Sequence, residues 1–182
     1  MATYKGIQGY TVQKLADDPT ASSATEGQLF YNSGTGKFKV GTAGTAAWAS
    51  GGSMNTARYG CTGAGIQTAA FMAGGYQPAA SVLNEQYDGS TWSEKADLNT
   101  ARAETANSGT VAAGLIFGGD TPVGDETETW NGSAWTETAD LNTGRAYLGR
   151  AGTQTAAMAI GGYSGGAYKT ETETFNGTSW TE

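Results

Sequence analysis

Residues 127–137 read TETWNGSAWTE, and two close variants occur elsewhere in the chain, NEQYDGSTWSE at residues 84–94 and TETFNGTSWTE at residues 172–182. Each copy holds an aromatic residue followed by Asp-Gly or Asn-Gly, with a tryptophan five residues after the aromatic. Asp-Gly or Asn-Gly between β-forming residues is the strongest local signal of a hairpin closed by a two-residue type I′ turn. The sequence therefore predicts three such hairpins.

The predicted turn decides which side chains share a face of the sheet. With Asn131 and Gly132 as the loop, Trp130 would face Ser133, and Glu128 would face Trp135. Two aromatic side chains and one glutamate would then lie on one side of each hairpin: Trp130, Trp135 and Glu128; Tyr87, Trp92 and Glu85; Phe175, Trp180 and Glu173. Because each aromatic can bury roughly 150 to 250 Å², we expect this side to be the packing face.

The hairpins belong to a repeat of 43 to 45 residues, a period typical of propeller or solenoid arrays. In each copy a pair of glycines lies sixteen residues after an arginine, and the tryptophan lies ten residues before the next arginine position. The recurring residues are Arg58, Arg102 and Arg145; Gly74, Gly75, Gly118, Gly119, Gly161 and Gly162; and Trp92, Trp135 and Trp180, with Trp48 closing an incomplete copy upstream.

A short apolar run ends at each glycine pair, over residues 67–73, 111–117 and 155–160. These runs are too short for helices and are bounded by turn-forming residues, so they are predicted to be strands. Their small side chains suit a strand crowded near an axis, and the glycines permit a sharp exit. The sequence thus predicts an all-β array of three full four-stranded repeats plus a leading strand.

The glutamate of each hairpin, Glu85, Glu128 or Glu173, needs a partner if it is buried, because a carboxylate without one is costly to remove from water. The recurring arginines are the only cations found once per period. We therefore expect one Glu and one Arg to join at each step, within a repeat or between repeats. A ligand-binding role for these residues is the alternative.

The composition of the 182 residues argues against several chemistries. Histidine is absent and Cys61 is the single cysteine, which removes the commonest general base, the commonest transition-metal ligand and any intrachain disulfide. A net charge of −7 with dispersed cations argues against a nucleic-acid surface. No apolar run reaches the roughly 20 residues of a membrane span, and residues 1–10 lack the apolar core of a secretory signal. We expect a soluble protein made in a cytoplasm, without a cleaved leader.

The order of landmarks over residues 48–182 resembles a short form of the kelch repeat: apolar strand, Gly-Gly, aromatic with Asp/Asn-Gly, Trp, then Arg. This resemblance implies four-stranded blades of a β-propeller. The tyrosine of the kelch motif is kept at Tyr87 but replaced by Trp130 and Phe175. The packing role survives these replacements, whereas a hydrogen bond from the hydroxyl does not.

The amino-acid sequence of the repeats further resembles kelch-like arrays in virion and tail-fibre proteins of tailed bacteriophages, particularly marine ones. The resemblance lies in segments such as Asn-Thr-Ala-Arg at residues 55–58 and Asn-Gly-Thr-Ser-Trp-Thr-Glu at 176–182. A segment common in such proteins is similar to residues 18–40. These residues predict a hairpin of strands 29–31 and 37–40 around the glycine-rich loop 32–36. Residues 1–25 are expected to be extended or to depend on a partner.

The chain is accordingly divided into an N-terminal attachment arm and hairpin, residues 1–50, and a repeat array, residues 51–182. The repeats cover about 51–94, 95–137 and 138–182. Three repeats are fewer than the 4 to 8 blades of a closed propeller. The missing blades could come from a longer chain or from other subunits, or the array could be open.

Candidate binding residues come from the one connection that varies in length, between the second glycine of the pair and the aromatic of the hairpin, at residues 76–84, 120–127 and 163–172. Loops on a rigid scaffold commonly carry recognition. We expect the three loops to emerge on one face and to offer tyrosines for stacking on sugars or packing on protein, the alternative being idle surface turns. The candidates are Tyr76, Gln77, Asp120, Asp125, Tyr163 and Tyr168.

Other interpretations are weaker. Asn131 and Asn176 match the N-glycosylation pattern, but both fall in predicted hairpin turns. Asp120, Asp125 and Glu126 lack the alternating ligands of a known calcium loop, so no metal or cofactor is predicted. The glutamates could serve glycoside hydrolysis, yet they recur identically in every copy, whereas catalysis needs one unusual site. We expect no enzymatic activity.

The sequence therefore predicts a phage virion structural protein, a tail-fibre or appendage subunit of a homo-oligomer. Its N-terminal segment would bind other virion proteins. Its blades would contact protein or recognise a glycan or protein of the host surface. The main alternative is a kelch-type interaction scaffold outside any virion, and a weaker one is a glycan-processing enzyme.

Overall fold

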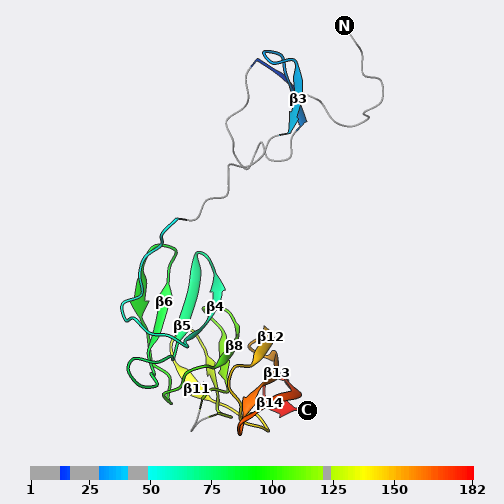
Figure 1. Ribbon diagram of the computed structural model, residues 1–182. Coiled ribbons are helices and arrows are strands. Elements are labelled where there is room, and N and C mark those ends of the chain that lie inside the picture. The colour runs from blue at the N-terminus through cyan, green and yellow to red at the C-terminus, as the bar shows by residue number, and fades with distance from the viewer. Residues whose placement is uncertain (1–12, 17–28, 41–48, 121–123) are drawn as a thin grey trace. The chain divides into compact units, whose positions relative to one another are not determined.

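The computed structural model describes residues 13–16, 29–40, 49–120 and 124–182, and within these ranges every regular element is a β-strand. The chain divides into two compact units, Met1–Ser50 and Gly51–Glu182 (Figure 1). The predicted all-β class is confirmed. Trp48, and with it the predicted leading strand, lies outside the described residues.

The N-terminal unit holds a three-stranded sheet in the order β1 (Gln13–Leu15), β2 (Leu29–Asn32) and β3 (Lys37–Val40). The predicted antiparallel hairpin of β2 and β3 is confirmed. The buried Asn32 closes its loop, since its side-chain Oδ1 accepts a hydrogen bond of 2.8 Å from the backbone N–H of Thr35. Strand β1, which pairs with β2 in parallel, was not predicted.

The second unit contains the three predicted four-stranded repeats, each an antiparallel sheet whose strands follow chain order. The first repeat sheet consists of β4 (Thr62–Ile66), β5 (Ala69–Ala73), β6 (Asn84–Tyr87) and β7 (Trp92–Glu94). The second consists of β8 (Ala106–Gly109), β9 (Gly114–Phe117), β10 (Thr127–Trp130) and β11 (Trp135–Glu137). The third consists of β12 (Gly149–Thr153), β13 (Ala156–Ser164), β14 (Ala167–Phe175) and β15 (Trp180–Thr181).

The predicted two-residue turns of the hairpins are wrong, whereas the predicted packing face is confirmed for the second and third hairpins. Trp130 pairs with Trp135 and Glu128 with Glu137, so the connection has four residues, 131–134. The side-chain Oδ1 of Asn131 accepts hydrogen bonds of 2.9 Å from the backbone N–H groups of both Ser133 and Ala134 and thereby stabilises the wider loop. The register differs from the expected one by two residues, and a shift of two leaves every side chain on its original face.

The predicted loop over residues 163–172 is also wrong, because β13 and β14 continue through it as a long hairpin. A bulge lies between Ile160 and Gly162, after which pairing resumes through Tyr163 and Tyr168. Gly165 and Gly166 close the hairpin with φ values of 60° and 82°. Two positive φ angles in succession are the requirement of a type I′ turn. The two-residue turn that was predicted at the Asn-Gly positions therefore occurs at Gly165-Gly166.

The three repeat sheets pack face to face in sequence, with two apolar clusters between them. The first sheet contributes Phe71 and Ala73 to the first cluster, and the second sheet contributes Leu115 and Phe117 to the second. The aromatic pairs of the following hairpins complete these clusters: Trp130 and Trp135 in the first, Phe175 and Trp180 in the second. The aromatic side of each later hairpin thus covers the preceding sheet.

Each recurring glutamate is buried and is held by the arginine of its own repeat, which decides between the two predicted arrangements. Arg58 pairs with Glu85 at 2.5 Å, Arg102 with Glu128, and Arg145 with Glu173 at 2.9 Å. An asparagine and a threonine three and two residues before each arginine donate their backbone N–H groups to the same carboxylate. We call this arrangement the carboxylate clamp.

Burial alone would raise the pKa of Glu85, but the hydrogen bonds from the Asn55 backbone and from Arg58 outweigh burial and hold this pKa below its usual 4.5. A lowered pKa in the folded state means that ionised Glu85 adds stability above its unfolded pKa, and that this stability is lost as the pH falls through the folded value. The clamp of the first repeat therefore contributes fully at neutral pH.

Trp135 tests the packing face. Trp135→Ala is expected to lower the free energy of unfolding by about 3 to 5 kcal/mol, because it opens a large cavity between two sheets. Thr136→Ala, at an exposed position on the other face of the same strand, should change it little. Urea denaturation of both variants measures the difference, and equal midpoints would contradict the face assignment.

A double-mutant cycle tests the clamp. Glu128→Ala removes the closer of the two carboxylates that face the buried Arg102, leaving Glu126 at 3.8 Å, and should destabilise the protein by about 3 to 5 kcal/mol. Adding Arg102→Ala should recover part of that loss. Arg145, which pairs with Glu173, provides the matched control, because its removal should not couple to Glu128. Coupling energies of equal size for both arginines would refute the pairing.

Candidate functional site: a tyrosine-lined pocket

The candidate site begins with a backbone chain that links the three repeats two residues after each arginine. The N–H of Glu104 donates to the carbonyl of Gly60 at 2.8 Å, and the N–H of Tyr147 donates to the carbonyl of Glu104 at 3.1 Å. Glu104 and Tyr147 have φ values of 53° and 57°. Left-handed backbone is unusual for residues other than glycine and tends to persist where the surroundings impose it, often at functional sites.

The residues that follow the glycine pairs, Tyr76, Asp120 and Tyr163, lie beside this chain. Tyr76 and Tyr163 each form an antiparallel bridge to the residue after their own arginine, while the N–H of Asp120 donates to the carbonyl of Ala103 at 2.9 Å. The hydroxyl of Tyr76 donates to Oδ2 of Asp120 at 2.7 Å. Two of the predicted binding residues, from different repeats, therefore touch.

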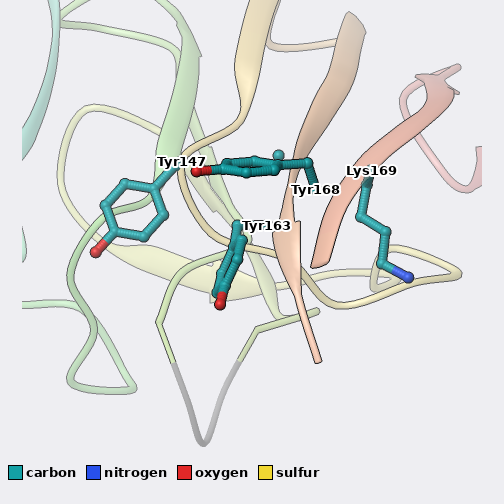
Figure 2. A pocket seen from close by; sticks show the side chains of 5 residues that line it. Tyr147, Tyr163, Tyr168 and Lys169 are labelled. Carbon is teal, nitrogen blue, oxygen red and sulfur yellow. The ribbon is translucent and has the colours of Figure 1, made fainter. Parts of the chain in front are cut away.

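The third repeat forms an open pocket lined by Tyr147, Gly162, Tyr163, Tyr168 and Lys169. Figure 2 shows the rings of Tyr147, Tyr163 and Tyr168 gathered on one side, while the Lys169 side chain extends away from them. The centroids of the Tyr163 and Tyr168 rings are 5.5 Å apart in an edge-to-face arrangement. Tyr168 is 90% exposed and Tyr147 is 60% exposed. The pocket thus presents aromatic surface to a ligand.

Glycines position these rings. At Gly162 a Cβ atom would lie 2.8 Å from the carbonyl oxygen of Ala146, and the φ of 108° excludes most other residues. The close approach brings Tyr163 next to the segment that carries Tyr147. The turn at Gly165 and Gly166 then returns the chain so that Tyr168 pairs with Tyr163 across the hairpin.

Neighbouring carboxylates affect the hydroxyl groups around the site. The hydrogen bond to Asp120, with burial and the charge of Asp120 adding to it, raises the pKa of Tyr76 to about 12. The charge of Glu104, followed by burial and the charge of Asp120, raises the pKa of Tyr147 above its usual value. The Tyr76 hydroxyl is thus held as the donor to Asp120, whereas the Tyr147 hydroxyl is protonated at neutral pH and lies in the lining of the pocket.

Of the predicted candidates, Tyr163 and Tyr168 line the pocket, and Tyr76, Gln77, Asp120 and Asp125 do not. Gln77 is exposed in a turn in which its N–H donates to the carbonyl of Ala79, and Asp125 is exposed while its carbonyl accepts from Leu141. Tyr147 was missed by the sequence analysis. It occupies the position of Gly60 and Glu104 in the other repeats, and three unlike residues at one position give no repeat signal.

The site offers aromatic surface and hydroxyl groups rather than metal ligands. Among residues 13–16, 29–40, 49–120 and 124–182, no group of three or more Cys, Asp or Glu residues is arranged to hold a metal ion. Glu126, predicted to share an acidic loop with Asp120 and Asp125, lies 3.8 Å from the guanidinium of Arg102.

No helix long and apolar enough for a membrane span is present in the described part of the chain. Neither a family model nor a curated protein matches the chain.

Removal of the Asp120 carboxylate tests the electrostatics of the site. In Asp120→Asn the pKa of Tyr76 is expected to fall from about 12 toward its ordinary value of 10.0, because the charged acceptor is lost. Titration of the tyrosine ring signals by NMR measures this pKa. Asp125→Asn is the control and should leave the pKa of Tyr76 unchanged. An unchanged pKa of Tyr76 in Asp120→Asn would contradict the hydrogen bond between Tyr76 and Asp120.

Proposed function

We propose that the three repeat sheets are blades of a kelch-like β-propeller, and that the protein is a structural subunit of a virus particle, a tail fibre or appendage that recognises the host surface. Face-to-face packing of successive four-stranded sheets supports the propeller. The backbone chain through Gly60, Glu104 and Tyr147 supports it as well, since residues at one repeat position follow one another from sheet to sheet. The virion role rests on the resemblance of the repeats and of residues 18–40 to phage fibre proteins.

The observation that carries host recognition is the cluster of exposed tyrosines in the third repeat. Soluble proteins rarely gather exposed aromatic side chains without a binding role. A tyrosine supplies a flat apolar face together with a hydroxyl that forms hydrogen bonds, and both match the apolar faces and hydroxyl groups of a sugar ring. The ligand class favoured by this pocket is therefore a surface polysaccharide of the host.

The clamps argue against the glycan-processing alternative. A glycosidase needs two carboxylates free to exchange protons or attack the sugar. Glu85, Glu128 and Glu173 are each buried and engaged by an arginine and by backbone N–H groups. A role in binding without turnover accords with this arrangement, and no cofactor is proposed.

The N-terminal unit, residues 1–50, is proposed to attach the protein to other virion proteins. It forms a compact unit separate from the repeats, as an attachment element that leaves the array free to bind would require. A kelch-type scaffold outside a virion is the second candidate function, favoured by the same exposed tyrosines if their ligand is a protein.

Tyr168 tests the carbohydrate pocket. Tyr168→Ala should lower affinity for the bound polysaccharide at least about 10-fold, because loss of one stacked ring corresponds to roughly 1.4 kcal/mol or more. Tyr168→Phe keeps the ring and should retain most of the affinity. Binding to an array of bacterial surface polysaccharides, followed by calorimetry on the best ligand, provides the measurement.

Ile66→Ala removes another exposed apolar side chain, on β4, and serves as the control that should bind like the parent protein. If the protein binds no polysaccharide on the array but captures a host protein through Tyr168, the scaffold function replaces carbohydrate recognition. Release of reducing ends during incubation would establish the enzyme instead.

Deletion of residues 1–50 tests attachment. The repeat unit should stay folded, with the same thermal midpoint, because its clusters and clamps all lie within residues 51–182. Virus particles assembled with the truncated protein should lack it, as quantified by mass spectrometry of purified particles. Normal incorporation would contradict the attachment role, and absence of the full-length chain from particles would contradict the virion role.

A further inference from the structure

Each junction between repeat sheets joins two different faces. The preceding sheet offers an apolar face of its second strand, and the following sheet offers the aromatic face of its hairpin. At the first junction a Cβ on Gly114 would lie 2.9 Å from the Phe71 ring, whose centroid is 5.7 Å from that of Trp135. At the second junction the Phe117 and Trp180 rings are 4.8 Å apart, and the Trp180 indole N–H donates to Thr127 at 3.1 Å.

The third sheet carries the apolar face of such a junction without a neighbour among the described residues. Its side chains occupy the positions that are fully buried in the first two sheets. The exposed fractions are 0% for Phe71, Ala73, Leu115 and Phe117, against 37% for Met158 and 40% for Ile160. A bulge follows Ile160 in the strand, before the residues that line the tyrosine-lined pocket.

The first sheet carries the opposite half of the same junction, also without a neighbouring sheet among the described residues. Trp135 and Trp180 are each 5% exposed, whereas Trp92 at the same position is only half-buried, as is Tyr87 beside it. Ala70 and Met72, which correspond to Gly114 and Ile116 of the second sheet, are half-buried too. Residues 51 and 52 reach part of the first sheet's face, where the indole N–H of Trp92 donates to the carbonyl of Gly52 at 3.0 Å. The two faces without a neighbouring sheet are the two halves of one interface that the chain itself forms twice.

We propose that the third sheet of one copy docks on the first sheet of a second copy of this chain, head to tail. Met158 would then cover Ala70 as Phe71 covers Gly114, and Ile160 would meet Trp92 as Phe117 meets Trp180. The ring of Trp92, whose N–H is bound to the Gly52 carbonyl within its own copy, would lie beside Thr172, the counterpart of Thr127. The occupant is a second copy because each free face matches, position by position, the partner that the other provides.

Two such contacts close a pair of copies into a ring. A contact between unlike faces generates either a closed ring or an open filament. Propellers close with roughly 4 to 8 blades, and a pair of these 182-residue chains brings together six of the described repeat sheets. The number six rests on the proposed propeller, whereas the matching of faces rests on the packing alone and is independent of the virion role.

Light scattering on the full 182-residue chain tests the pairing. The expected mass is twice the 18.6 kDa of one chain. Ile160→Lys should halve it while leaving the far-ultraviolet circular dichroism spectrum unchanged, because the residue is 40% exposed in the single copy. Ile66→Lys places the same charge at a 70% exposed isoleucine of β4 and should keep the doubled mass. A single-copy mass for the parent chain, or a doubled mass for Ile160→Lys, would overturn the proposal.

A mixing experiment distinguishes head-to-tail docking from contact between two like faces. Met72→Lys alters the opposite half of the junction and should also give the single-copy mass. If Met72→Lys does not fold, Ala70→Arg is used in its place. Mixing Ile160→Lys with Met72→Lys should give the doubled mass at a higher protein concentration than the parent chain needs, because one of the two contacts then joins two unaltered faces while the other carries both lysines. A mixture that stays at the single-copy mass, a Met72→Lys variant that pairs by itself, or open-ended growth of the parent chain would each refute the closed head-to-tail pair.

Discussion

The rest of the array depends on one buried carboxylate per repeat. Glu128 has no exposed surface and receives the guanidinium of Arg102, the backbone N–H of Asn99 and Thr100, and the side-chain amide of Asn99. The Asn99 amide also donates to the carbonyl of Trp135, so the segment before β8 is tied to the last hairpin of the same sheet. A buried ion pair of this kind adds little to the free energy of unfolding compared with apolar side chains of similar size, yet removing one partner lowers that free energy strongly. The clamp therefore specifies geometry more than it adds stability.

The clamp also sets how one sheet meets the next. The carbonyl of Arg102 accepts the N–H of Gly75 from the preceding repeat at 2.9 Å, and the carbonyl of Arg145 accepts the N–H of Gly119 at 3.0 Å. A Cβ on Gly74 would lie 2.5 Å from the Arg102 oxygen, which explains why the first glycine of the pair is needed. One arginine thus neutralises a carboxylate with its side chain and positions the neighbouring sheet with its backbone.

The third repeat departs from this scheme, and the candidate site lies where it does. Its glycines belong to the β13–β14 ladder, in which Gly162 pairs with Lys169, and the hairpin extends to bring Tyr168 beside Tyr163. The same repeat exposes Met158 and Ile160 on the face that is buried in its counterparts. The tyrosine-lined pocket and the exposed apolar face thus both belong to the repeat that differs most from the other two.

Sequence periodicity by itself determined the all-β class, the three four-stranded repeats and the aromatic packing face, since alternation along a strand survives an error of two residues in register. It also indicated that glutamate and arginine would pair. Tertiary structure alone decided that each pair lies within one repeat and that residues 163–172 continue a hairpin. It also brought Tyr147 to Tyr163 and Tyr168. A repeat pattern records what the copies share, whereas the site is formed by residues in which they differ, and only the packing of sheets brings such residues together.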